Sequence, residues 1–180
     1  MASMIGSKVE RKEDKKFLTG RGRYTADINL HNQSYAIFIR SPHARAKITG
    51  IDTSKAKKAS GVIDVLTGKE LQDDKIGGLI AGWKIVSKDG TDMKCPAHPA
   101  LATDLVNYVG DHVALVVAES LQEAKDAAEL VKVDYKVLKA VVSTGQAMDS
   151  DTIHDGIDKN LCSGWIALNA DITNLDKCGF

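Results

Sequence analysis

The sequence has few of the residue types that mark disulfide-rich or metal-binding proteins. Its 180 residues include three prolines, 5% aromatic residues and three cysteines. Cys95, Cys162 and Cys178 are widely spaced and form no Cys-x-x-Cys motif, so the sequence encodes neither an iron–sulfur cluster nor a zinc ribbon. We therefore expect reduced thiols in a cytoplasmic protein.

The chain also lacks an excess of charge and a long hydrophobic run. Lys and Arg together number 24, as do Asp and Glu, so no global field recruits nucleic acid or an acidic membrane. The longest apolar stretches, such as 113–118, are the length of a strand and too short to span a bilayer. No apolar segment follows the charged N-terminal arm, which argues against a secretory signal.

What the sequence does contain is enough apolar material for one packed domain, with 43% hydrophobic residues. Apolar and β-branched residues predict strands at 34–40, 44–52, 61–66, 112–118 and 131–135. The run at 112–118 is almost entirely apolar, which is typical of a strand buried on both faces. The segment 72–103, rich in glycine and proline, predicts a long excursion with one strand near 79–86.

Short helices are predicted between these strands. Thr67 with Glu70, and Ser120 with Glu123, have the spacing of capping boxes at helix N-termini. The second helix should end near Leu130; its expected apolar stripe is Leu121, Ala124, Ala128 and Val131. A further short helix is expected at 53–60, closed by Gly61.

The strand–helix–strand unit at 112–135 would have right-handed crossover geometry if its two strands were parallel. The elements together predict an α/β or α+β domain, with short helices packed on one side of a mixed β-sheet.

Several segments in a fixed order resemble one known family. They are 17–24 (FLTGRGRY), 38–44 (FIRSPHA), 61–62, 65–68, 109–114 (VGDHVA) and 127–135. Together they resemble the N-terminal domain of the molybdenum hydroxylase large subunit, in the xanthine dehydrogenase and aldehyde oxidase family. The resemblance extends over about residues 5–160. The segments 81–83, 87–90 and 97–101 look most like the large subunit of aerobic carbon monoxide dehydrogenase.

The resemblance implies an α/β-hammerhead fold of the α+β class. It places the hammerhead domain at 1–145 and, at 146–180, a connection toward molybdenum cofactor-binding domains. From about Asn169 the match ends, which a truncated reading frame, a frameshift or a gene fragment would each explain.

The resemblance also implies a parent enzyme that oxidises carbon monoxide or another small substrate, with water as the oxygen source. Such a large subunit holds a molybdenum–pterin cofactor and passes electrons to iron–sulfur and FAD subunits. The family's catalytic and cofactor-binding motifs lie beyond this domain, so no catalytic, cofactor-binding or metal residue is assigned here. We expect the chain alone to be a non-catalytic scaffold whose partners are the rest of the large subunit and those two subunits. The alternative is a stand-alone hammerhead module for binding or assembly.

Two motifs invite a more specific chemical interpretation. Gly20-Arg21-Gly22-Arg23 could cradle a phosphate, but Thr25 occupies the place of the third glycine, so a chain turn is favoured. Cys95 and His98 could chelate a metal only with further ligands. His112 and Cys162 are candidates for these by residue type alone. An unliganded pair is favoured over a small metal-dependent enzyme.

His43 and His112 could each act as a general base, but no nucleophile stands in a supporting motif beside them. Structural hydrogen bonding is the favoured role for both histidines. Asp111, after Gly110, is expected to belong to a turn. For Trp83 two roles stay open: packing against another domain, or a place in the local core.

Overall fold

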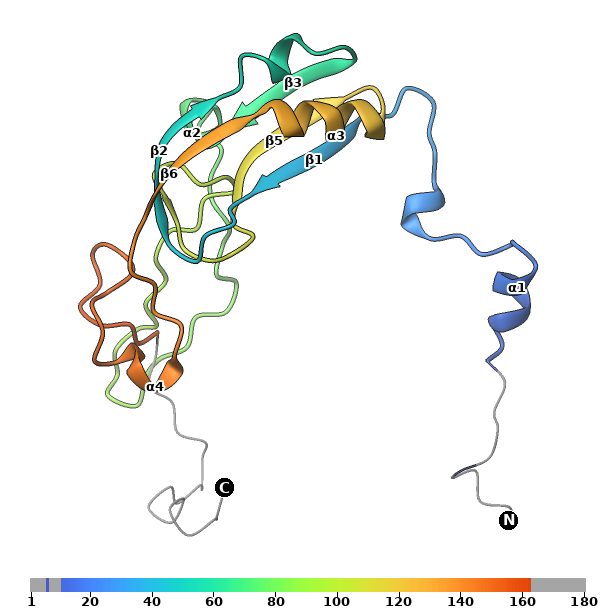
Figure 1. Ribbon diagram of the computed structural model, residues 1–180. Helices are drawn as coiled ribbons and strands as arrows, with labels where there is room; N and C mark the ends of the chain where they lie inside the picture. Colours follow the sequence, from blue (N-terminus) through green and yellow to red (C-terminus); the bar gives the residue numbers. More distant parts are fainter. Residues whose placement is uncertain (1–5, 7–10, 163–180) are drawn as a thin grey trace. The chain divides into compact units, whose positions relative to one another are not determined.

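The computed structural model describes Gly6 and residues 11–162 (Figure 1). The chain divides into two units, Met1–Gln33 and Ser34–Phe180. Cys178 and the chain end at Phe180 lie outside the described residues.

The first unit contains α1 (Asp14–Leu18) and the 3-10 turn η1 (Thr25–Asp27). Gly20 follows α1 with φ of +67°, a left-handed conformation that glycine adopts without strain. A Cβ on Gly22 would lie 2.6 Å from Cδ1 of Phe17, whose ring stacks on Tyr24. Local geometry therefore explains why glycine occupies both positions. The turn predicted for this segment is confirmed at Gly20.

The second unit is built on two three-stranded sheets. The first sheet has the order β1 (Tyr35–Arg40), β5 (His112–Ala118) and β3 (Val62–Thr67). The second has the order β4 (Leu105–Val106), β2 (Ala46–Asp52) and β6 (Lys132–Val137). Short elements connect them: η2 (Ala56–Lys58), α2 (Gly68–Asp73), α3 (Leu121–Leu130) and α4 (Thr144–Ala147).

The expected α+β class and the main strands are confirmed, but the sheet is not the mixed one that we expected. The four pairings between the named strands are antiparallel. The reason lies in the strand–helix–strand unit at 112–135. Its first strand, β5, is the centre of the first sheet, whereas β6 pairs with β2 in the second sheet. The intervening helix thus connects two sheets, and no parallel crossover arises.

The helix α3 lies across β1 and β5 (Figure 1). Ser120 accepts a hydrogen bond from the N–H of Glu123 at 3.2 Å and donates one to its carboxylate at 2.7 Å, so the N-cap of the predicted capping box is confirmed. The buried residues of α3 are Ala124 and Ala127, whose small side chains bring the helix close to the sheet. The predicted stripe is therefore shifted: Ala127 was missed, and Leu121 is exposed.

Two apolar cores result, one over each sheet. Ala127 packs with Ala56, Val65 and Val116 beneath α3. On the other face of the first sheet, Val113 joins a core built mainly from the second sheet, with Ala46, Ile48, Ala102 and Val106. All of β5 is buried or half-buried, as its apolar run predicted.

Two sequence predictions about local structure need correction. The helix expected at 53–60 is only the three-residue turn η2, although Gly61 does adopt the positive φ, +71°, that we expected. Between 79 and 86 the structure forms isolated bridges, Leu79 with His98 and Val86 with Asp92, instead of a strand. Six glycines and prolines within 77–99 interrupt any continuous ladder there.

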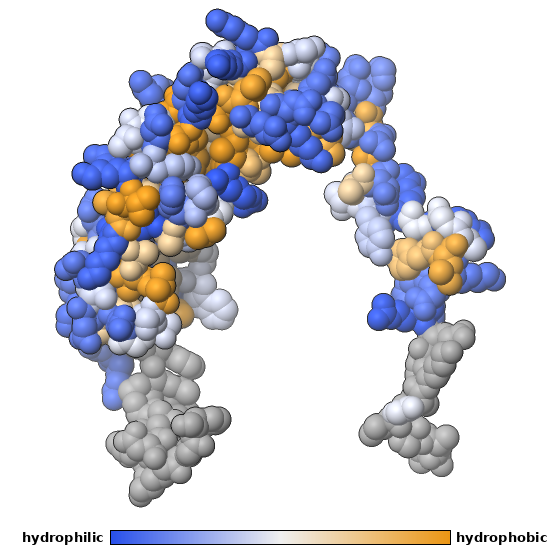
Figure 2. Space-filling model, viewed as in Figure 1, coloured by the Kyte–Doolittle hydropathy of each residue, from blue (hydrophilic) through white to orange (hydrophobic). Residues whose placement is uncertain are grey.

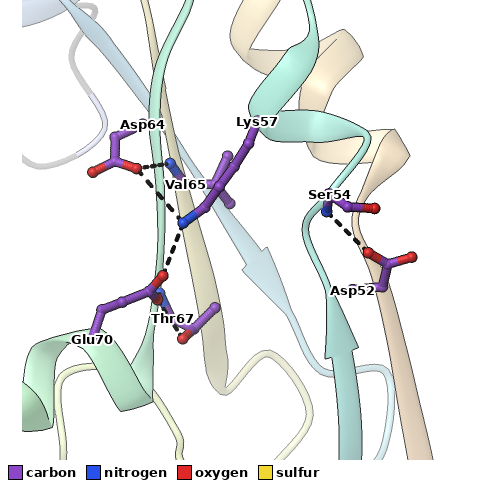
Figure 3. A network of polar contacts seen from close by, with 7 residues as sticks. All are labelled: Asp52, Ser54, Lys57, Asp64, Val65, Thr67 and Glu70. Atoms are coloured by element: carbon purple, nitrogen blue, oxygen red, sulfur yellow. Dashed lines mark hydrogen bonds and ion pairs between the residues drawn. The ribbon is translucent and has the colours of Figure 1, made fainter.

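The helix α2 begins with the second predicted capping box. Glu70 accepts a hydrogen bond from the N–H of Thr67 at 2.6 Å, and it also accepts one from Nζ of Lys57 at 2.9 Å (Figure 3). Lys57 lies 4.0 Å from Asp64 of β3 as well. This network ties η2, β3 and α2 together at one end of the first sheet.

Candidate functional site

The two most informative sequence segments meet in space. At the end of β1, the N–H of Ser41 donates to the carbonyl of Asp111 at 2.8 Å. The N–H of Gly110 donates back to the carbonyl of Ser41 at 2.8 Å. Arg40 adds a third bond, from Nη1 to the carbonyl of Gly110 at 3.1 Å. The segments 40–44 and 108–114 thus form one junction.

The buried polar side chains of this junction serve the backbone. Ser41 Oγ accepts the N–H of His43 and donates to the carbonyl of the same residue, both at 3.1 Å. Asp111 Oδ2 accepts the N–H of Asn107 at 3.0 Å, which confirms its expected place in a turn. Side chains that bind nearby backbone groups in this way organise the local chain.

Neither histidine of the junction is arranged as a general base toward a nucleophile. His43 packs edge-on against Tyr135, with ring centroids 5.0 Å apart, and His112 stacks on Phe38 at 4.3 Å. Burial raises the pKa of the Tyr135 hydroxyl, against an opposing hydrogen bond with Ser41, so this group stays protonated at neutral pH. Within the described part of the chain, the junction holds no histidine–nucleophile pair. The structural hydrogen bonding expected of His112 is not made by its Nε2, which is buried without a partner among the described residues.

A groove runs beside the junction, between residues 96–107 on one wall and 153–155 on another. It consists of two adjoining cavities of about 450 and 270 Å3 that share Asn107, Ile153 and His154. The sequence did not point to Asn107, which lines both cavities, or to Arg45, which lines a neighbouring cavity together with Asn107 and Ile153. Asn107 Oδ1 and Arg45 Nε are buried and have no hydrogen-bond partner among the described residues. Arg45 does donate to the carbonyls of Lys139 and Ile153, at 3.4 and 3.3 Å.

The lining of this groove does not fit a molybdenum–pterin cofactor. No lysine or arginine is among the described residues of its two cavities, whereas Asp104, Asp111 and Asp155 are. The anionic phosphate of a pterin cofactor would meet these three carboxylates without a lysine or arginine to offset their repulsion. We therefore assign no cofactor contact to these residues.

Cys95 and His98 make separate contacts. Cys95 Sγ lies 3.6 Å from the carbonyl of Met93, and His98 Nε2 lies 3.4 Å from the Tyr108 hydroxyl. No group of three or more His, Cys, Asp or Glu side chains that could hold a metal ion occurs in the described ranges. The metal-enzyme hypothesis thus gains no support from geometry.

The segment 76–86, which follows α2 in the sequence, exposes many apolar side chains. Large side chains of 76–86 are open to solvent, with Ile80 91% and Trp83 83% exposed; the others are Ile76, Leu79, Ile85 and Val86. Of the two roles left open for Trp83, the local core is therefore wrong. Figure 2 shows hydrophobic side chains exposed among hydrophilic ones on the second unit.

The first sheet has a second apolar surface, on the face opposite α3. Phe38, Leu115 and Leu66 are paired across its three strands, so their side chains share this face. Phe38 is exposed, and Leu66 and Leu115 are half-buried. We call these three residues the open face.

No helix of the described residues is long and apolar enough to cross a membrane.

Comparison with known proteins places this architecture. The family model described as "Aldehyde oxidase and xanthine dehydrogenase, a/b hammerhead domain" matches residues 19–139. Among curated proteins, the nicotine 6-hydroxylase large subunit of Paenarthrobacter nicotinovorans is 40% identical over 86% of this chain. The carbon monoxide dehydrogenase large chain of Afipia carboxidovorans is 37% identical over 82% of it. This chain spans only 18% and 17% of the length of these two relatives.

Solved structures are similar in the same way. Quinoline 2-oxidoreductase from Pseudomonas putida 86 superposes with a TM-score of 0.74 and 34% identity, over 88% of this chain and 20% of that one. A CO dehydrogenase from Oligotropha carboxidovorans superposes with a TM-score of 0.60 and 37% identity, over 81% of this chain and 17% of that one.

Proposed function

Because this chain belongs to the aldehyde oxidase and xanthine dehydrogenase family through its hammerhead domain, we propose that it acts as a non-catalytic scaffold within a molybdenum-dependent large subunit. In this role it packs against the cofactor-binding domains of that subunit and takes no part in the chemistry. The function of the chain is then to bind other domains through its surface.

The observation that carries the proposal is the exposed apolar segment 76–86. Soluble monomers rarely expose large contiguous apolar patches, and patches of this kind mark interaction sites. Trp83 is the largest anchor of the segment, and buried tryptophans often dominate the energy of an interface. The open face of the first sheet offers a second apolar surface for such contacts. The junction between 40–44 and 108–114 also favours a scaffold role, because its buried polar side chains form hydrogen bonds with the backbone.

For the parent enzyme, we propose hydroxylation or oxidation of carbon monoxide or another small substrate. Water supplies the oxygen, and electrons pass to iron–sulfur and FAD subunits. Relatives with different names, a nicotine 6-hydroxylase and a carbon monoxide dehydrogenase, have similar identities to this chain, 40% and 37%. Their substrates are therefore candidates at the level of small molecules. We further propose a cytoplasmic location, a hammerhead domain at 1–145 and a connecting segment at 146–180.

Association with the cofactor-binding domains of a relative tests the scaffold directly. The chain would be co-expressed with a nicotine 6-hydroxylase large subunit that lacks the matching hammerhead residues, and co-purification would be measured. We expect the two chains to co-purify and the double variant Ile80→Asp/Trp83→Ser to abolish this. Ile63→Ser serves as the control, because Ile63 is also exposed but lies outside the segment.

Two results would contradict the proposal. One is a monodisperse chain that neither binds the truncated subunit nor takes up a hydrophobic dye, which is the behaviour of the stand-alone module. The other is stoichiometric molybdenum in the purified chain, measured by elemental mass spectrometry.

A further inference from the structure

Two exposed cysteines lie on neighbouring segments that are far apart in the sequence. The N–H of Lys94 donates to the carbonyl of Cys162 at 2.9 Å. In the same place, Sγ of Cys162 lies 3.5 Å from the carbonyl oxygen of Lys94. Cys95 is the next residue along the chain, and both thiols are free and exposed. The side chain of Lys94 also forms an ion pair with Asp158.

Peptide geometry places Cys95 within reach of the second thiol. In a trans peptide the carbonyl oxygen of one residue lies about 2.8 Å from the Cα of the next. The Cα of Cys95 is therefore within about 6.3 Å of the Cys162 sulfur. Rotation about χ1 moves a cysteine sulfur by several ångströms, and solvent exposure leaves that rotation free. Cys95 Sγ now faces the carbonyl of Met93 through a weak contact at 3.6 Å.

We propose that Cys95 and Cys162 form a modification site, a dithiol that a small-molecule disulfide such as glutathione disulfide converts into an intramolecular disulfide. One cysteine thiolate attacks the glutathione disulfide, forms a mixed disulfide and releases one glutathione thiolate. The second cysteine thiolate attacks the protein sulfur of that mixed disulfide and releases the second glutathione. Two protein thiols are oxidised, and one glutathione disulfide is reduced to two glutathione thiols.

The bond would join two walls of the groove beside Asn107. Pro96 and Ala97, which follow Cys95, line one side, and Ile153 and His154 line the other. Near the cysteines these walls are held by an exposed ion pair and the two contacts between Lys94 and Cys162. A covalent link there limits how far the groove can open.

Trypsin separates the three cysteines, which makes the pairing measurable. Cleavage after lysine places Cys95 in peptide 95–125, Cys162 in 160–177 and Cys178 in 178–180. The full chain would be incubated in native buffer with glutathione disulfide, alkylated without reduction, digested and analysed by mass spectrometry. We expect an intact chain lighter by two hydrogen atoms, with the 95–125/160–177 pair as the dominant cross-link.

The denatured chain is the matched reference. In urea, the shorter loop between Cys162 and Cys178 closes at a smaller entropy cost, so that pair should dominate. Selectivity for Cys95 with Cys162 in native buffer would thus be due to the fold. The variant Cys178→Ser should keep the native cross-link, and Cys162→Ser should leave Cys95 as a glutathione adduct.

Three results would overturn the proposal. They are a dominant Cys162–Cys178 link in native buffer, stable glutathione adducts on both Cys95 and Cys162, and two thiols that stay unmodified.

Discussion

At the scale of single residues, the structure assigns geometric roles to positions that sequence patterns only mark. The buried carboxylate of Asp111, just before β5, accepts a hydrogen bond from a backbone N–H. The buried hydroxyl of Ser41, just after β1, accepts another. Leaving such a buried backbone group without a partner costs about 1–3 kcal/mol. These residues therefore stabilise the junction between the two strands, and their chemistry is used within the fold.

Gly61 is a position where substitution should be damaging because of its backbone conformation and its contact with Glu123. Its φ is +71°, and a Cβ there would lie 2.1 Å from the carboxylate carbon of Glu123. Gly61→Ala should lower the free energy of unfolding by about 1–3 kcal/mol, from backbone strain and the displaced capping carboxylate. Urea unfolding followed by circular dichroism measures this. Gly77→Ala, where no atom lies within 4 Å, should change stability by less than about 0.5 kcal/mol; equal losses in both variants would contradict the steric argument.

At the scale of elements, capping decides where the short helices begin. The Thr67–Glu70 box is complete and Ser120 caps α3, because a side chain three residues from its cap can reach it without help from the rest of the fold. The helices α2 and α3 have six and ten residues, too few to be stable in isolation. Their stability depends on these caps and on packing against the first sheet.

Ser120→Ala removes the acceptor for the N–H of Glu123 at the start of α3. The loss should be about 1 kcal/mol in unfolding free energy, the usual cost of losing an N-cap. Ser120→Asp, which restores an acceptor and favours the helix N-terminus electrostatically, should recover most of it. Thermal or urea unfolding of the three proteins provides the measurement, and an Asp variant as weak as the Ala variant would refute the capping role.

Glu70 should make the stability of the α2 end depend on pH. Burial alone would raise its pKa, but hydrogen bonds from Thr67 and Lys57 outweigh this, and the pKa of Glu70 lies below its ordinary value. A lowered folded-state pKa stabilises the protein above the unfolded-state value, near 4.5, and that stabilisation is lost as the pH falls further. Its size is below about 1 kcal/mol, because the pair is partly exposed and screened by solvent.

Glu70→Gln should therefore be less stable than the wild type at pH 7 and should lose less stability between pH 5 and pH 3. Urea unfolding at several pH values measures both effects. Asp73→Asn is the matched control, since it removes the same charge from the same helix without touching Thr67 or Lys57. If the Glu70 variant and the wild type had the same pH profile, this carboxylate would not contribute to the pH dependence of stability.

At the scale of the whole molecule, the distribution of apolar surface matters more than any one cavity. The groove beside Asn107 is lined by carboxylates and neutral residues, whereas the segment 76–86 presents large apolar side chains to solvent. We expect a scaffold domain to have a stable interior and an exposed apolar surface that contacts other domains.

The purified chain should accordingly bind a hydrophobic dye such as ANS with enhanced fluorescence. Ile80→Ser/Trp83→Ser should reduce this fluorescence at least about twofold, because it removes the two most exposed large side chains of the segment. Ile63→Ser should change it little. Circular dichroism of each variant shows whether the fold is retained, and a dye signal that is independent of the segment would place the exposed surface elsewhere.

The sequence by itself determined the features that depend on neighbouring residues. Apolar and β-branched residues predicted the strand at 44–52, and the apolar run at 112–118 predicted a strand buried on both faces. The ordered signature segments were enough to identify the family. These signals are legible because strand periodicity and capping act over a few residues.

Only the tertiary structure decided which strands pair, which surfaces stay exposed and which distant residues meet. It paired β6 with β2 and not with β5, left Trp83 in solvent, and brought Cys162 beside Lys94. It also placed Asn107 and Arg45 at one cavity next to the groove. Each of these outcomes depends on contacts between residues far apart in the chain, where the order of residues says nothing about distance. A local pattern can specify an element, but the packing of all elements together determines where that element lies.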